Sequence, residues 1–349
     1  FYYRLADVPA QGIPQGIDMS FWHGKSILVT GGTGFIGSHL VDRLLDAGAS
    51  VRVIGRSKER LFDRIGHKAD EVDFVEGDLF RREDAQKGCK GMEVVFHLAG
   101  KLAGVGWNSA HPGTMFTENT LFGLHMLDAA AKQEVERYLC VSSACIYSGD
   151  CEVPTFEKDG FFNDPDAANF GYGWAKRTME IQARAYANEF DMKIGIIRPY
   201  NGYGPRDDFE WETSHVIPAL IRKVIERQNP INVWGDGLQT RSFLYVSDFV
   251  EGLLLGLEKY PAGDPINIGT NEETTIKDLI RKIIQISGHN VNVEFDTTKP
   301  RGQARRNGDF KKAEKLLGFK ATVSLDEGLQ KTIDWYINTG RRSSIAKSL

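Results

Sequence analysis

Short apolar runs rich in β-branched residues alternate with longer amphipathic segments through the first 200 residues. Six of these runs predict buried strands, at residues 25–31, 50–55, 72–78, 93–99, 137–143 and 193–199. The amphipathic segments between them, such as 36–48 and 119–133, are long enough for the helical crossovers that parallel strands require. This alternation predicts an α/β fold with a doubly wound parallel sheet of the Rossmann type.

The pattern becomes less regular after Pro199. A loop rich in Gly, Pro and aromatic residues precedes a predicted helix at 216–228 and strand at 231–235, and later helices are predicted at 276–288, 310–319 and 325–340. We expect a dinucleotide-binding domain of residues 24–198 plus about 238–268, and a smaller mixed α/β substrate-binding lobe of 199–237 plus about 269–340. Residues 1–23 are expected to form an N-terminal surface arm.

The composition narrows the class of protein. With 349 residues, 41% of them hydrophobic, the chain can bury a large core. Its 43 basic and 47 acidic residues include no basic block, which argues against a nucleic-acid or membrane-surface partner. No apolar run approaches the roughly 18 to 20 residues of a membrane helix. Residues 1–18 also lack the basic-then-apolar order of a signal peptide.

The four cysteines are Cys89, Cys140, Cys145 and Cys151, and none of them is in a CxxC spacing. We therefore expect neither a disulfide framework nor a metal site, and a reducing cytoplasm fits this composition best.

A glycine motif, TGGTGFIG, lies between the first predicted strand and the first predicted helix. Gly31, Gly34 and Gly37 permit a tight turn there, and the backbone N–H groups of the turn and of Phe35 and Ile36 can approach a pyrophosphate. Because the motif has the required strand before it and helix after it, it predicts a bound dinucleotide.

Residues at the ends of the next strands complete the expected cofactor site. Asp78 follows the third strand as a possible partner of adenine, although an ordinary strand-end aspartate is the alternative. Leu79 is its neighbour, and Leu98 and Ala99 end the fourth strand.

The end of the second strand indicates which dinucleotide is bound. An acidic residue there would hold the ribose 2′-hydroxyl, but Gly55 occupies that place and Arg56 follows it. A guanidinium suits a phosphate, so the sequence favours NADP(H). NAD(H) remains the alternative if Arg56 only faces solvent.

The motif YGWAK places Tyr172 and Lys176 four residues apart on a predicted helix. This spacing puts both side chains on one face, where the ammonium can favour the phenolate and hold the nicotinamide ribose while tyrosine moves a proton. Ser143 ends the fifth predicted strand and can bond the same substrate oxygen. These three residues predict hydride-transfer chemistry.

Taken together, these motifs resemble the extended short-chain dehydrogenase/reductases that act on nucleotide sugars. The resemblance covers roughly residues 24–338 and includes GGTGFIGSHL, HLAG, YGWAK, RPYNGYGP, VWGDGLQTRSFLYVSD and INIGT. Within that family, SSACIY resembles the GDP-mannose 3,5-epimerases, whereas the loop ending in SHVIPALIRK resembles the GDP-fucose synthases. The acid/base lysine of the first branch has no clear counterpart in this chain.

The resemblance implies a role for Cys145 and His215. Oxidation of a sugar at carbon 4 makes the hydrogens on carbons 3 and 5 acidic, so a thiol base and a histidine acid could invert either centre. The alternatives are a small buried core residue for Cys145 and a loop hydrogen-bonder for His215.

The second lobe must then hold a nucleotide diphosphate. Asn201 is a candidate donor to the pyrophosphate or sugar, and Arg241 and Arg306 offer charge-assisted bonds to phosphate, with surface salt bridges as the alternative. Val216 and Trp234 are candidates for the walls of the base pocket. A guanine base rests on the resemblance alone.

The resemblance leaves several functions open. The favoured one is a redox-neutral epimerase that inverts carbon 3, carbon 5 or both through a 4-keto intermediate. A 3,5-epimerase/4-reductase that starts from a GDP-4-keto-6-deoxy sugar and consumes NADPH is the nearest alternative. A C4 epimerase or dehydratase of a nucleotide sugar and a non-catalytic dinucleotide sensor follow. The resemblance also implies a homodimer.

Overall fold

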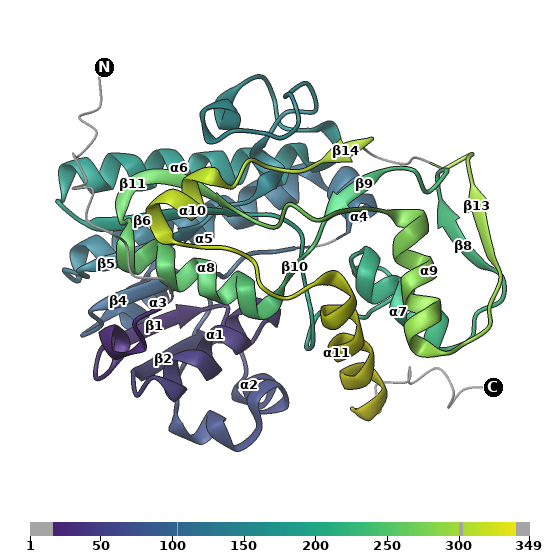
Figure 1. Ribbon diagram of the computed structural model, residues 1–349. Helices are drawn as coiled ribbons and strands as arrows, with labels where there is room; N and C mark the ends of the chain where they lie inside the picture. Colours follow the sequence, from purple (N-terminus) through teal and green to yellow (C-terminus); the bar gives the residue numbers. More distant parts are fainter. Residues whose placement is uncertain (1–16, 103, 300–302, 340–349) are drawn as a thin grey trace.

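A seven-stranded parallel sheet forms the centre of the computed structural model, which describes residues 17–102, 104–299 and 303–339 (Figure 1). Its strand order is β11-β6-β5-β4-β1-β2-β3, and each neighbouring pair runs parallel. The strands are β1 (Ser26–Thr30), β2 (Ser50–Gly55), β3 (Asp73–Glu76), β4 (Val94–His97), β5 (Arg137–Val141), β6 (Lys193–Pro199) and β11 (Ala262–Ile268). The predicted doubly wound fold and its six strands are confirmed.

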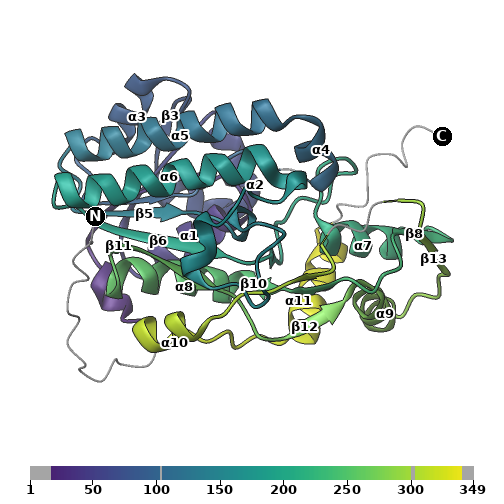
Figure 2. The same cartoon turned by 90° about the horizontal axis from the view of Figure 1, so that it is seen from above.

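Helices cover both faces of this sheet (Figures 1 and 2). On one face, apolar side chains of three helices share a core with β1 and β2: α1 (Phe35–Asp46), α2 (Lys58–Ile65) and α8 (Val246–Lys259). On the other face lie α3 (Arg82–Cys89), α5 (Pro112–Lys132) and α6 (Phe170–Glu189). Figure 2 shows α5 and α6 side by side, and the two helices pack closely on each other.

A second lobe has its own apolar core between three further helices. These are α7 (Val216–Ile225), α9 (Ile276–Ser287) and α11 (Leu325–Asn338), and a parallel pair, β8 (Ile231–Trp234) and β13 (Val293–Asp296), lies beside them. In Figure 1 this lobe is on the right, beyond the carboxyl ends of β1, β4 and β5.

Short elements connect the two lobes. The short strands are β7 (Gly202–Tyr203), β9 (Thr240–Ser242), β10 (Leu244–Tyr245), β12 (Glu273–Thr275) and β14 (Arg305–Arg306). The remaining helices are α4 (Val105–Ala110), η1 (Met19–Trp22), η2 (Gly66–Glu71), η3 (Ala144–Ile146), η4 (Glu157–Phe161) and η5 (Ala167–Asn169). Of these strands, β9 pairs with both β12 and β14, which brings two late segments of the chain together.

Two segments pack differently from the sequence expectation. The helix predicted at 310–319 is α10 (Lys311–Leu317), and Ala313 and Leu317 join the core beneath the parallel sheet because α10 packs on α8 and β11. Of the expected N-terminal arm, residues 1–16 lie outside the described residues. Trp22, near its end, is fully buried in the same core and contacts Phe96.

Among the described residues, no helix combines the length and the apolar character that a membrane span requires.

Candidate active site

The glycine motif forms the turn between β1 and α1. Gly31 has φ of +71°, and a Cβ on it would lie 2.9 Å from the backbone nitrogen of Ala99. A Cβ on Gly37 would lie 2.1 Å from the Gly31 carbonyl oxygen, so α1 approaches the turn as closely as a glycine allows. Gly34 begins α1 without a side-chain cap, which leaves the N–H groups of its first turn available. This geometry fits a dinucleotide pyrophosphate.

The predicted residues on β2 and β3 lie at the same edge of the sheet. Arg56 is exposed directly after β2, and Ser57 then caps α2. Asp78 accepts a hydrogen bond of 3.1 Å from the Phe80 backbone, which fixes the turn after β3. Leu79 is buried, and its carbonyl oxygen lies 2.9 Å from Nδ1 of His125.

The end of β4 is held by polar residues that the sequence analysis missed. Nδ1 of the fully buried His97 lies 2.8 Å from the Thr30 hydroxyl, which accepts a bond of 3.0 Å from the Ala99 N–H. Asn119 of α5 accepts from the Lys101 N–H at 2.9 Å and donates to the Lys101 carbonyl. Asn119 is 1% exposed, a burial that the sequence does not indicate. These bonds fix the segment that begins with Leu98 and Ala99.

The three predicted hydride-transfer residues meet at the end of β5. The Ser143 side chain opposes the rise in the pKa of Tyr172, and Lys176 Nζ donates to the Val141 carbonyl oxygen at 2.8 Å. The Lys176 ammonium lies 5.6 Å from the centre of the Tyr172 ring. Tyr172 and Lys176 are each 4% exposed. The residues therefore form one group, as their spacing predicted.

Burial decides the acid–base behaviour of this group. It raises the pKa of Tyr172 well above its ordinary value, an effect that Cys145 increases and the Ser143 hydrogen bond opposes. Burial also lowers the pKa of Lys176. It lowers the pKa of His97 to about 3, so this histidine is neutral. A substrate at this site would meet groups with strongly shifted proton affinities, which is typical of active sites.

Cys145 lies in the turn after Ser143. Its backbone N–H donates to the Ser143 hydroxyl at 3.1 Å, and its side chain is partly buried. Nη2 of Arg306 lies 3.0 Å from the Cys145 sulfur. The sequence analysis selected both residues but did not pair them. A guanidinium at this distance stabilises negative charge on sulfur.

Arg241 lies beside Arg306 because β9 and β14 pair in register at these two residues. Nη1 of Arg241 donates to the carbonyl oxygens of Thr240 and Gln303, at 2.7 and 2.9 Å. Burial, with the neighbouring Arg306 charge, lowers the pKa of Arg241 to about 10. No carboxylate of the described residues lies within salt-bridge distance of either arginine. Two adjacent guanidinium groups of this kind suit an anion such as a diphosphate.

The remaining predicted residues are less directly placed. Asn201 donates to the Ser242 carbonyl oxygen at 2.8 Å, which ties the segment after β6 to β9. Val216 begins α7, and Trp234 of β8 is 56% exposed.

His215 is the exposed N-cap residue of α7. Within the described residues, its side chain makes no hydrogen bond to Cys145 or Tyr172. The adjacent Ser214 carbonyl oxygen lies 3.5 Å from where a Cβ on Gly104 would be. The loop therefore flanks the segment that follows β4.

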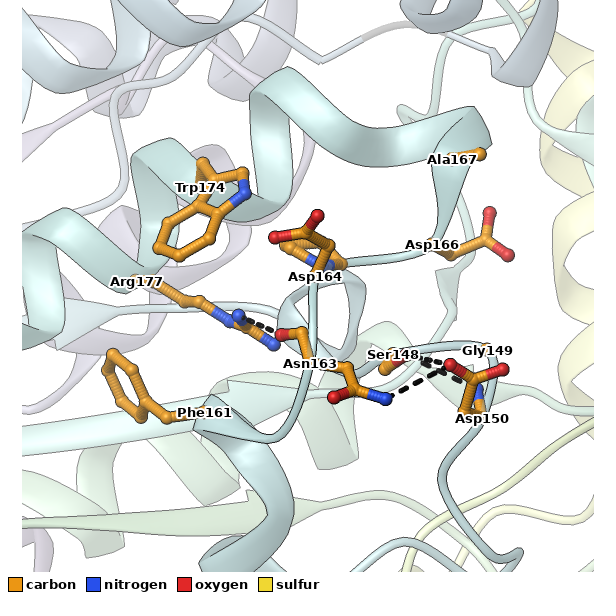
Figure 3. Close-up of a pocket in the computed structure, with 11 residues that line it drawn as sticks. Ser148, Gly149, Asp150, Phe161, Asn163, Asp164, Asp166, Ala167, Trp174 and Arg177 are labelled. Carbon is orange, nitrogen blue, oxygen red and sulfur yellow. Dashed lines mark hydrogen bonds between the residues drawn. The ribbon is translucent and has the colours of Figure 1, made fainter.

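An open hollow of about 760 Å³ lies between the 148–150 segment, the 161–167 segment and the first turns of α6 (Figure 3). Arg177 and Trp174 line it, and the Arg177 guanidinium is held between the rings of Trp174 and Phe161, at 5.0 and 5.6 Å. Its Nη1 also donates to the Asn163 carbonyl oxygen. These contacts fix the 161–166 segment.

The described residues contain no group of His, Cys, Asp or Glu side chains that could hold a metal ion.

Residues 27–269 match the sequence model of the NAD dependent epimerase/dehydratase family. The chain is 32% identical over 320 residues to UDP-glucuronic acid decarboxylase 2 of Arabidopsis thaliana, covering 91% of this chain and 68% of the relative. It is 29% identical to a GDP-L-fucose synthase of Sinorhizobium fredii, covering 90% and 96% of the two chains. It is also 29% identical to GDP-mannose 3,5-epimerase 1 of Oryza sativa, covering 88% and 81%.

Solved structures with the same fold also bind nucleotide sugars. A UDP-glucose 4-epimerase of Thermotoga maritima, solved with UDP-glucose, matches with a TM-score of 0.80 and 30% identity over 90% of this chain and 99% of its own. A UDP-glucuronic acid 4-epimerase of Bacillus cereus, solved with UDP-glucuronic acid and NAD, matches with a TM-score of 0.78 and 27% identity, covering 90% and 99%.

We predict that Gly37→Ala weakens NAD(P)H binding by at least about tenfold, or roughly 1.4 kcal/mol. The added methyl group would overlap the Gly31 carbonyl oxygen and push α1 away from the turn. Titration of the cofactor by fluorescence measures the change. Gly113→Ala is the matched control, because a Cβ there meets nothing within 4 Å. Equal affinity in both variants would mean that the turn does not bind the dinucleotide.

Proposed function

Because this chain belongs to the NAD dependent epimerase/dehydratase family, we propose that it is a nucleotide-sugar epimerase that inverts carbon 3, carbon 5 or both through a 4-keto intermediate. One observation carries this proposal. Cys145 lies in the turn after Ser143, and its sulfur is 3.0 Å from Nη2 of Arg306. Hydride transfer alone needs no thiol. A second proton-transfer group next to Tyr172 suits chemistry at the carbons beside carbon 4.

The first half of the reaction uses the group around Tyr172. A nicotinamide dinucleotide at the glycine turn would accept a hydride from carbon 4 and later return it. Tyr172 would take the proton of the carbon-4 hydroxyl, with Ser143 holding the same oxygen. The Lys176 ammonium would stabilise the charge that develops on the phenol. Tyr172 would give the proton back when the carbonyl is reduced.

The second half uses the thiol. The carbon-4 carbonyl makes the hydrogens on carbons 3 and 5 acidic. Cys145, as a thiolate that Arg306 would stabilise, would take one of them as a proton and become a neutral thiol, leaving the negative charge on the sugar enolate. His215, from the loop beside Gly104, is the proposed donor to the opposite face, which would invert the centre.

The second lobe would hold the nucleotide diphosphate. Arg241 and Arg306 would bind the phosphates, with Asn201 next to them, while Val216 and Trp234 would contact the base. We favour a GDP-sugar because the chain is similar to a GDP-L-fucose synthase and a GDP-mannose 3,5-epimerase along most of its length. The reducing cytoplasm is the proposed compartment, since all four cysteines are free.

A 3,5-epimerase/4-reductase is the second candidate. The exposed Arg56 after β2 favours this candidate. Gly55 stands where an acidic side chain would repel the 2′-phosphate of NADPH. A dehydratase is less suited, because Ala144 and Cys145 offer no carboxylate beside Ser143. A C4 epimerase would leave Cys145 without a role, and a non-catalytic sensor would not need the intact group around Tyr172.

Incubation in heavy water with GDP-, UDP- and dTDP-hexoses, and with a GDP-4-keto-6-deoxy-hexose plus NADPH, tests these alternatives. Deuterium at carbon 3 or 5, read by mass spectrometry and NMR, is expected without net consumption of cofactor. Stoichiometric loss of NADPH would select the epimerase/reductase. Absence of exchange with every hexose would reject both.

We predict that Cys145→Ser slows solvent-deuterium exchange by about 100-fold or more while folding hardly changes, because a hydroxyl is a much weaker acid than a thiol. Hydride transfer at carbon 4 belongs to Tyr172 and should survive. The two steps are measured separately, by deuterium incorporation and by cofactor absorbance. Cys151→Ser, at the other partly buried cysteine, is the control and should exchange normally. A wild-type exchange rate in Cys145→Ser would make the thiol structural.

Arg56→Asp should shift cofactor preference from NADP(H) toward NAD(H) by at least about tenfold, or roughly 1.4 kcal/mol. The new carboxylate would repel a 2′-phosphate and accept a bond from a 2′-hydroxyl. Titration of both cofactors against wild type and variant measures the preference. Arg43→Asp, an exposed site near the far end of α1, controls for net charge. If discrimination is the same in all three proteins, Arg56 does not contact the ribose.

We also propose a homodimer formed through α5 and α6, whose outer faces carry the exposed side chains of Phe116, Phe170 and Ile181. Exposed apolar groups of this size on two adjacent helices suit a buried interface. Light scattering should give twice the mass of the chain at micromolar concentration, and Ile181→Asp should give a monomer. Phe62→Asp on α2 is the control, which should remain dimeric. A monomeric wild type would overturn the proposal.

A further inference from the structure

A buried ion pair lies directly below the candidate active site. Glu180 is on α6, four residues after Lys176, and its side chain is completely buried. Arg198, near the end of β6, is 1% exposed and donates to both Glu180 oxygens, at 2.8 and 2.6 Å. This two-pronged geometry is the strongest arrangement that a guanidinium and a carboxylate can make.

The pair is connected to both ends of the turn that carries Cys145. Before the turn, the buried Ser142 hydroxyl donates to Oε1 of Glu180, the oxygen that also accepts from Nε of Arg198. After the turn, Arg198 donates to the Tyr147 hydroxyl at 3.0 Å. Tyr147 in turn donates to the Asn267 side chain of β11 at 2.6 Å. One carboxylate therefore links the turn, the catalytic helix and two strands of the sheet.

Stability alone does not explain this arrangement. Desolvation of two charges offsets much of their attraction, and apolar residues of similar volume often stabilise a protein as well or better. Rigid placement of the reacting groups, in contrast, requires side chains that are locked by a second layer of bonds. Glu180 lies where it can lock both Ser143, through Ser142, and Lys176, through the shared helix.

We propose that Glu180, paired with Arg198, is a positioning residue that fixes the Ser143–Cys145 turn against Tyr172 and Lys176. The inference rests on the proposed function, since it assigns to Glu180 the alignment of the two proton-transfer groups. Glu180 does not contact the reacting atoms, so its effect is expected on kcat more than on KM.

The same carboxylate acts on Lys176 through its charge. Charged or titratable groups approach Lys176 from each element packed around it: Tyr172 and Glu180 of α6, Cys140 of β5, Cys145 of η3 and His97 of β4. Burial lowers the pKa of Lys176, and the negative charge of Glu180 opposes this effect. Removal of that charge should therefore lower the pKa of Lys176 further, so the ammonium would lose its proton at a lower pH.

Glu180→Gln and Ser142→Ala test the two effects separately. For Glu180→Gln we expect at least a tenfold loss of kcat, a change of less than threefold in KM, and a basic limb of the pH–rate profile at lower pH. Ser142→Ala keeps the charge, so its kcat should fall while its basic limb stays in place. Glu189→Gln, an exposed glutamate at the end of the same helix, should behave as wild type.

A titration of Lys176 by NMR in [¹³Cε]lysine-labelled protein, assigned with Lys176→Arg, reads the charge effect without turnover. If the wild type shows no exchange with any sugar, the proposed function fails, whereas the Lys176 titration still tests Glu180. An unchanged Lys176 midpoint in folded Glu180→Gln would overturn the electrostatic effect. If Glu180→Gln does not fold, wild-type kcat in Ser142→Ala would overturn the positioning role.

Discussion

The need to keep one ammonium group in a buried position constrains the centre of this molecule. Lys176 is 4% exposed, and its one direct bond in the described structure is to the Val141 carbonyl at the end of β5. A buried cation is unfavourable unless nearby groups supply negative charge or hydrogen-bond acceptors. The end of β5, the turn after it and the buried face of α6 are therefore arranged around this group, and they are also the elements that carry Ser143, Cys145 and Tyr172.

The second constraint is where the parallel strands end. The order of strands reverses between β1 and β4, so the loops after these strands separate and leave space for a ligand. The glycine turn occupies one side of that space and the Leu98–Ala99 segment the other. Tyr172 and Ser143 follow at the neighbouring strand, β5. In the proposed function, the glycine turn and the Leu98–Ala99 segment would hold the dinucleotide, and Tyr172 and Ser143 would act on the substrate beside it.

Two arginines beside the Cys145 turn come from segments far from it in the sequence. Arg241 and Arg306 come from short strands that pair with each other after the chain has left the parallel sheet. Arg306 contacts the Cys145 sulfur, so in the proposed function the anion-binding arginines would adjoin the thiol. In the proposed function, Arg306 would connect substrate binding with proton transfer, because it would face the diphosphate as well as the sulfur.

The sequence by itself determined the parts of this protein that depend on local patterns. The six strands, the glycine turn and the Tyr172–Lys176 pair follow from the alternation of apolar runs and from spacings of three or four residues, which translate directly into backbone geometry. Tertiary structure alone decided which polar residues are buried. Asn119 and Glu180 look like surface positions in the sequence, and Arg198 lies in a predicted buried strand with no partner indicated; only packing of α5 and α6 on the sheet makes their hydrogen bonds obligatory. It also decided that Arg306 lies against Cys145, 161 residues earlier, because the pairing of β9 with β14 depends on how the two lobes come together.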